Sequence, residues 1–331
     1  MTRKAGRPHA GSSPVSALPL KLPIKPLLLV LGLVATAYAA ALLIWGGSPH
    51  ALLASLARLG SWTGLQAAGL CLLSYLLRGV RWRLWMAHYG RHFGWIEGLR
   101  LYLAGYTFTP TPGNVGEAVR GLMLARNPLG AKQSLAIFGA ERLADLLCLL
   151  LLGLPGVMWL FGHGDVQRAM QAAPSALVAL LGVLGLALAV LLGLVIRYRA
   201  ALRQRFSWLQ EAWPCLALRP RVWFALTLTA WTAQGVAAWL VCRDLEIDLP
   251  MLTAAGFYAL AMVAGALSAL PAGLGGTEAV LTGLLIAHGA TPGAALSATV
   301  LIRLLTLWLA VAIGVTALLY SAAIRKEISF R

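Results

Sequence analysis

Long apolar runs alternate with short basic segments along most of the chain. Several runs exceed the roughly 18–20 apolar residues that an α-helix needs to cross a bilayer. Ala and Leu are frequent in them, and the strict alternation of a membrane β-barrel is absent, so the runs predict helices. We expect an all-α, polytopic membrane protein. The predicted full spans, about six, are 26–45, 62–86, 133–160, 176–196, 222–241 and 294–319.

Two other apolar stretches are too short and too interrupted to cross a bilayer alone. Each has a longer arm, a break at proline and glycine, and a short second arm. The arms are 95–109 and about 117–124 in the first case, and 252–270 and about 278–287 in the second. Each pair predicts a re-entrant helical hairpin. Irregular backbone at membrane depth is tolerated only where protein or a water-filled cavity covers it.

The two breaks share one pattern in register. Pro110 and Glu117 in the first correspond to Pro271 and Glu278 in the second, and an arginine follows each glutamate by the same spacing, at Arg142 and Arg303. Broken helices at corresponding positions in two halves of a membrane protein point to a transport site. The expected hinge or backbone residues are Pro110, Pro112, Gly113, Gly116, Pro271, Gly273, Gly275 and Gly276.

The charge distribution predicts an orientation. The chain has a net charge of +16, and its basic residues sit between apolar runs, as the positive-inside rule describes. Only Arg58, Arg168 and Arg243 fall in proposed outer loops, so both termini are expected in the cytoplasm and the protein in the cell inner (plasma) membrane. The basic residues do not form a soluble face, so nucleic acid is not an expected partner.

With this orientation, the first hairpin enters from the cytoplasmic face and the second from the outer face. The two repeats, about 95–160 and 252–319, are therefore predicted to be inverted about an axis in the membrane plane. One transmembrane domain over 26–320 is expected. It would be flanked by a disordered basic cytoplasmic tail, 1–25, and a second cytoplasmic tail, 321–331.

Six charged residues are expected nearest the apolar interior, where an unpaired charge costs several kcal/mol: Glu117, Glu141, Arg142, Asp145, Glu278 and Arg303. On the helix over 133–160, Glu141 and Asp145 share a face, whereas Arg142 cannot face both of them. Arg120 lies on the same face as Glu117 and has no basic counterpart in the second repeat. The predicted substrate-binding or coupling residues are Glu117, Arg120, Glu141, Arg142, Asp145, Glu278 and Arg303.

Two interpretations of these charges stay open. In the functional one, the arginines bind a phosphate and the carboxylates accept protons or act as partners. In the structural one, an Arg–Glu pair joins each hairpin to the span behind it, and the glutamates at 117 and 278 cap their short helices. A further basic and aromatic cluster, Arg78–Arg83, is interpreted as a cytoplasmic boundary. The histidines and four cysteines are dispersed, so neither a metal nor a cofactor is expected.

At these residues the chain resembles the flippase-like integral membrane family that shares the transmembrane region of lysylphosphatidylglycerol synthases. The resemblance covers roughly 25–320 and includes the branch associated with hopanoid biosynthesis. Its motifs are matched by Pro112, Gly116, Glu117 and Arg120, then by Glu141, Arg142 and Asp145, then by Pro271, Gly273, Gly275 and Glu278, and last by Arg303.

The resemblance implies translocation of a lipid with a phosphate-bearing or polar headgroup. Members are implicated in moving aminoacylated phosphatidylglycerol, polyprenyl-phosphate-linked sugars and hopanoid-pathway lipids. The aminoacyl-transferase domain of the fused synthases has no counterpart here, so a transporter is expected rather than an enzyme. The alternatives are a membrane-embedded lipid-modifying enzyme and a non-catalytic partner of lipid-biosynthesis enzymes. The sequence does not indicate an oligomeric state.

Overall fold

A computed structural model describes residues 57–111, 114–121, 129–162, 207–268 and 270–329, with a few positions between 29 and 40. Every regular element in these ranges is helical, which confirms the all-α class. The predicted tail 1–25, most of the first span, the span over 176–196, and Pro112 and Gly113 lie outside the described residues.

The described elements are η1 (Arg58–Gly60), α3 (Trp62–His88), α4 (Trp95–Ala104), η2 (Gly105–Phe108), η3 (Val115–Gly121), α5 (Ala131–Gly162), α9 (Ser207–Ala217), α10 (Pro220–Asp244), α11 (Met251–Leu267), α12 (Gly276–Ala287), α13 (Pro292–Arg303), η4 (Leu304–Trp308) and α14 (Leu309–Ser329). Among the described residues, three helical segments are long and apolar enough to cross a membrane: Ala131–Gly162, Pro220–Asp244 and Pro292–Ser321. α3 was also predicted as a span, but it carries three arginines and is not in this group.

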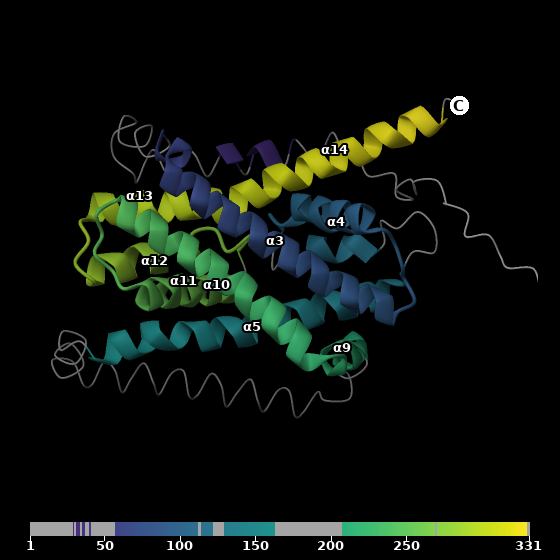
Figure 1. Cartoon of the computed structure of the whole chain (residues 1–331), viewed down its shortest axis with the longest axis horizontal. Coiled ribbons are helices and arrows are strands. Elements are labelled where there is room, and N and C mark those ends of the chain that lie inside the picture. The colour runs from purple at the N-terminus through teal and green to yellow at the C-terminus, as the bar shows by residue number, and fades with distance from the viewer. Residues whose placement is uncertain are drawn as a thin grey trace, which may run out of the picture.

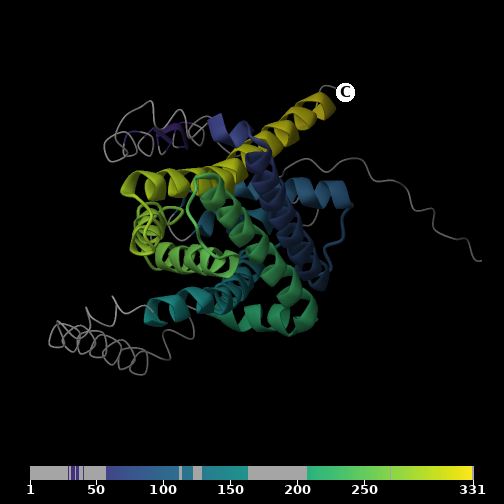
Figure 2. The same cartoon turned by 60° about the vertical axis from the view of Figure 1, so that its left-hand side comes forward.

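Figure 1 shows α13, η4 and α14 as one long rod across the molecule, with α3 and α10 running side by side. The rod packs against α4 and η2, whereas α5 packs against α9, α10 and α11. Figure 2, a turned view, keeps α12 beside α11, as expected for the second predicted hairpin. Both apolar helices of that hairpin are shorter than the three long segments.

Local sequence signals explain where several helices begin. The Ser61 hydroxyl accepts from the Gly64 N–H at 3.1 Å and caps α3, and the Thr291 hydroxyl does the same for the Ala294 N–H at 3.3 Å in α13. Pro292 fits the first turn of α13 because the N–H groups there have no partner within the helix. These caps fix the ends of the helices that carry the charged residues.

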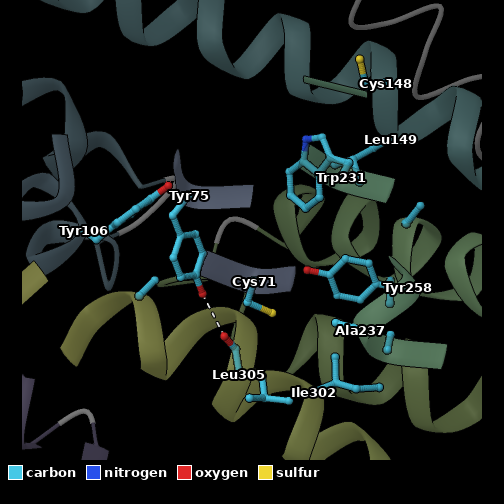
Figure 3. Close-up of a cluster of buried hydrophobic side chains, with 14 of the residues drawn as sticks. Cys71, Tyr75, Tyr106, Cys148, Leu149, Trp231, Ala237, Tyr258, Ile302 and Leu305 are labelled. Carbon is cyan, nitrogen blue, oxygen red and sulfur yellow. Dashed lines mark hydrogen bonds between the residues drawn. The ribbon is translucent and has the colours of Figure 1, made fainter. Parts of the chain in front are cut away.

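A π-helical turn, η4, follows Arg303 directly. Such a turn shifts the backbone hydrogen bonds and frequently marks a functional position. The Tyr75 hydroxyl of α3 donates to the Leu305 carbonyl at 2.8 Å and lies 3.1 Å from the Thr306 carbonyl, as Figure 3 shows for Leu305. α3 is therefore hydrogen-bonded to the π-helical turn η4, directly after Arg303.

The contact between α5 and α11 depends on glycine. A Cβ on Gly256 would lie 2.5 Å from the backbone nitrogen of Gly156, so the two helices meet backbone to backbone. We expect Gly256→Ala to lower the free energy of unfolding by about 1–3 kcal/mol, because the helices must separate. Thermal unfolding of the purified protein in detergent measures this. Gly69→Ala is the control, since its added Cβ meets nothing within 4 Å, and an equal loss there would contradict the packing argument.

Candidate functional site

The middle of α5 presents two carboxylates to the interior of the bundle. Asp145 Oδ1 accepts from Arg81 Nη1 at 2.7 Å and from Trp231 Nε1 at 3.2 Å. Glu141 Oε2 accepts from Arg120 Nη1 at 3.1 Å, and its Oε1 lies 3.7 Å from Arg81 Nη2. The predicted shared face of the two carboxylates is confirmed, because both reach Arg81.

Glu117 and Arg142 complete a closed arrangement of alternating charges. Glu117 Oε2 accepts from Arg120 Nη2 at 2.6 Å and lies 3.6 Å from Arg142 Nη2. Arg142 Nη2 also lies 3.2 Å from Asp145 Oδ2. We call this set the charge ring; in order around it, its members are Arg81, Asp145, Arg142, Glu117, Arg120 and Glu141.

Burial separates one member of the charge ring from the rest. Arg81, Arg120 and all three carboxylates are buried, whereas the side chain of Arg142 is 33% exposed. Buried charges are stable only when paired, and each buried member has opposite charges on both sides. Arg142 is therefore the member that a ligand can reach.

Arg120 is enclosed by more than its carboxylates. Its guanidinium carbon lies 4.4 Å from the ring centre of Tyr102 and 5.2 Å from that of Tyr106. A Cβ on Gly105 would collide with the Arg120 side chain, so the absence of a side chain there makes room for it. The space beside Arg120 is about 10 Å³, enough for about one water molecule.

The predicted boundary cluster on α3 is corrected by the structure for two of its arginines. Arg81 is fully buried in the charge ring, and Arg78 is buried beside it. Arg78 Nη2 donates to Gln234 Oε1 at 3.1 Å, and its guanidinium lies 3.9 Å from the Trp231 ring centre. Both point into the bundle because positions three apart share a helix face.

The second repeat contains a simpler ion pair. Arg303 Nε donates to Glu278 Oε1 at 2.6 Å, and Arg303 Nη2 donates to the Ala272 carbonyl at 2.9 Å. Glu278 Oε2 accepts from the Gly275 N–H at 2.6 Å, so this carboxylate caps α12, one of the roles considered for it. Gly275 has φ +85°, a backbone conformation that favours glycine.

The sequence repeat thus appears in the structure as two Glu–Arg contacts at corresponding positions. Glu117 contacts Arg142 in the first repeat, and Glu278 contacts Arg303 in the second. Each contact joins a broken segment to the long helix behind it, as the structural interpretation expected. The two differ in strength: the second is a short hydrogen-bonded pair, whereas the first belongs to the ring and leaves Arg142 partly exposed.

A cavity of about 310 Å³ lies between the two breaks. Such a volume is at the lower end of the range for small-ligand sites. Asn114 lines it from the first break, and Gly273 and Thr277 line it from the second. Of the seven predicted site residues, Arg142 and Asp145 are in its lining, and the other five are not.

The wall of the cavity is mostly apolar and reaches the outside of the bundle. Leu146 on α5 and Leu267 at the end of α11 both line it, and both are exposed on the molecular surface. Leu267 is 80% exposed. The cavity therefore has polar groups at its inner end and an apolar side that continues to the outer surface.

Two polar atoms in the cavity lining have no hydrogen-bond partner among the described residues. They are Asp145 Oδ2 and Thr277 Oγ1, and both residues are buried. Asp145 Oδ2 lies near Arg142, but without hydrogen-bond geometry. Buried polar groups are nearly always satisfied, so unsatisfied ones in a cavity indicate a place for a polar ligand or water.

Sequence reasoning missed four residues of this site: Arg78, Arg81, Trp231 and Thr277. For the two arginines a signal existed, because they are three apart and face the same way as Tyr75, whereas Arg83 points elsewhere on the helix. Trp231 and Thr277 gave no such signal. Their roles depend on α10 and α12 meeting α5 and the second break.

Residues 29–314 match the family described as the lysylphosphatidylglycerol synthase TM region. The chain belongs to this family. Both breaks, the charge ring and the Glu278–Arg303 pair lie within the matched residues. Family membership identifies a membrane protein, and the family's description names the membrane region of a phospholipid synthase.

A search of curated proteins gives a shorter similarity. Over 95 residues the chain is 27% identical to a UPF0104 membrane protein of Methanothermobacter thermautotrophicus. The match covers 29% of this chain and 28% of the relative, so the chain matches less than a third of that protein's length.

Proposed function

We propose that the protein translocates a lipid with a phosphate-bearing headgroup across the inner membrane, with the headgroup held in the cavity between the two breaks. The observation that carries this proposal is the partly exposed side chain of Arg142 in a cavity lined by both repeats. Arginine forms two parallel hydrogen bonds to a phosphate, which suits this position. The apolar side of the cavity lets the acyl chains remain in the bilayer.

The balance of interior charges supports an anionic headgroup. Among the described residues of this interior, five arginines face four carboxylates, which leaves one positive charge in excess. The arginines are Arg78, Arg81, Arg120, Arg142 and Arg303, and the carboxylates are Glu117, Glu141, Asp145 and Glu278. A phosphate that enters the cavity would neutralise the excess, and a neutral headgroup would not.

Arg142 also offers a way to couple binding to movement. It contacts Glu117 of the first break and Asp145 of its own helix, and an entering phosphate would compete with both for its N–H groups. Loss of the Glu117 contact would loosen the first break from α5. Protonation of the released carboxylate would keep it stable in the interior.

Transport in liposomes tests the proposal. The full chain is reconstituted with fluorescent phosphatidylglycerol, and a membrane-impermeant reductant measures how much label becomes accessible. We expect exchange with the wild type and at least a tenfold lower rate with Arg142→Ala, about 1.4 kcal/mol or more in the barrier. Arg221→Ala, an exposed arginine at the start of α10, is the control and is expected to retain the rate. Equal label accessibility in wild type, Arg142→Ala and empty liposomes would contradict the proposal.

The hydroxyl of Thr277 provides a second test. In Thr277→Val, a methyl group replaces a buried hydroxyl that lacks a partner, so we expect the unliganded protein to gain about 1 kcal/mol of stability and transport to fall. Thr299→Val is the matched control, because the Thr299 hydroxyl accepts from Thr282 at 2.9 Å and its loss should destabilise. Thermal unfolding and the liposome assay measure both effects. A destabilised Thr277→Val would show that the hydroxyl is a structural group.

A further inference from the structure

A second cavity lies on the outside of the bundle, in the groove between α3 and α4. Its volume is about 160 Å³, and its lining is apolar except for one arginine, Arg83. Val80 and Ile96 line it from the two helices, and Ile96 is 85% exposed. The groove is separate from the cavity between the breaks, since the two share no lining residue.

Arg83 lies against aromatic rings at one end of this groove. Its guanidinium carbon is 4.3 Å from the ring centre of Trp95 and 5.6 Å from that of Phe93. A Cβ on Gly98 would strike the Phe93 ring and approach Arg83 Nη1 at 3.6 Å, so glycine there allows this arrangement. An arginine stacked on a ring still directs its N–H groups outward along the edge of its plane.

Arg83 has no ion-pair partner among the described residues, and its Nη1, a buried atom, has no hydrogen-bond partner there. This sets it apart from Arg78 and Arg81 on the same helix, which point into the bundle and are partnered. Since positions three apart share a face and Arg83 is out of step with both, its side chain lines the groove on the other face of α3. A cation at the end of an apolar groove complements an anion with an apolar chain.

We infer that the α3–α4 groove is a binding site for an anionic phospholipid. One acyl chain lies along Val80 and Ile96, and the phosphate receives hydrogen bonds from Arg83. The exposed Trp95, 64% accessible, fits the headgroup level of a bilayer, where tryptophan is enriched. This lipid would stay on the outer surface and is distinct from a headgroup held in the cavity of the proposed function.

Binding of fluorescent phosphatidylglycerol to the delipidated full chain in neutral detergent tests this inference. All measurements use the Arg142→Ala background. This variant lacks the arginine that is proposed to bind the headgroup in the other cavity. We expect Arg83→Gln to weaken binding about fivefold, the effect of about 1 kcal/mol per basic residue near a lipid surface. Val80→Phe, which fills the groove without a change of charge, should weaken it as well. Arg221→Gln is the charge-matched control and should bind as the parent does.

The competitors identify what the groove recognises. Unlabelled phosphatidylglycerol should displace the probe, whereas phosphatidylcholine and inorganic phosphate should not at equal concentration. Displacement of the probe by inorganic phosphate would show that the groove binds a free anion rather than a lipid. Equal displacement by phosphatidylcholine would show that the groove has no preference for a negatively charged headgroup. If Arg83→Gln and Arg221→Gln weaken phosphatidylglycerol binding equally, the proposed site in the α3–α4 groove is wrong. Because Arg142 is absent throughout, these results are independent of the proposed translocation.

Discussion

Arg81→Met is expected to lower the free energy of unfolding by about 3–5 kcal/mol, the cost of removing one partner from a buried ion pair. Asp145 would lose its 2.7 Å hydrogen bond, and Glu141 would keep only Arg120 as a close partner. Methionine fills a similar volume, so the cost reflects the uncompensated carboxylates rather than an empty space. Thermal unfolding in detergent, followed by size-exclusion chromatography, measures the loss.

Arg142→Met is the matched control for this prediction. Both substitutions remove one arginine from the charge ring, but Arg142 is one-third exposed, and the two carboxylates beside it keep their hydrogen bonds to Arg120 and Arg81. For Arg142→Met we expect a small loss of stability and a large loss of transport. For Arg81→Met the main effect is the loss of stability. Equal destabilisation by the two substitutions would mean that the ring works as one structural unit without a separate ligand position.

The repeated glutamate and arginine positions show how much of the site could be predicted from the sequence. The register of Glu117 with Arg142 and of Glu278 with Arg303 was visible as a repeat, and both contacts are present in the structure. Scarce charged residues in an apolar chain must find partners, so their spacing carried information. The all-α class followed from the long apolar runs, because a helix pairs the backbone N–H and C=O groups of a membrane segment within that segment.

The closest partner of Asp145 could not be predicted in the same way. Glu117 bonds most closely to Arg120 rather than Arg142, and Asp145 to Arg81, which is 64 residues away on α3. The pattern around Arg81 is also that of a membrane boundary, and only the packing of α3 against α10 turns it inward. The partner of Asp145 depended on a tertiary contact that has no trace in local spacing, whereas the Glu117–Arg120 pair, three residues apart, already shared a predicted helix face.

Glu278→Leu is expected to destabilise the protein by about 3–5 kcal/mol, because Arg303 would remain buried with only the Ala272 carbonyl as a partner. The N–H of Gly275 would also lose its acceptor at the start of α12. The double variant Glu278→Leu/Arg303→Met removes both charges together. We expect it to recover most of the lost stability, since well-packed apolar residues often replace a buried ion pair without cost.

Transport then separates a structural pair from a functional one. If Glu278 and Arg303 only join α12 to the rod, the double variant should transport lipid at the wild-type rate once its stability has recovered. If the pair opens and closes as the second break moves, a stable double variant should remain inactive in the liposome assay, because two apolar side chains cannot replace an ion pair that breaks and re-forms. We expect the second result. The π-helical turn directly after Arg303 gives the rod a place to adjust when the pair opens.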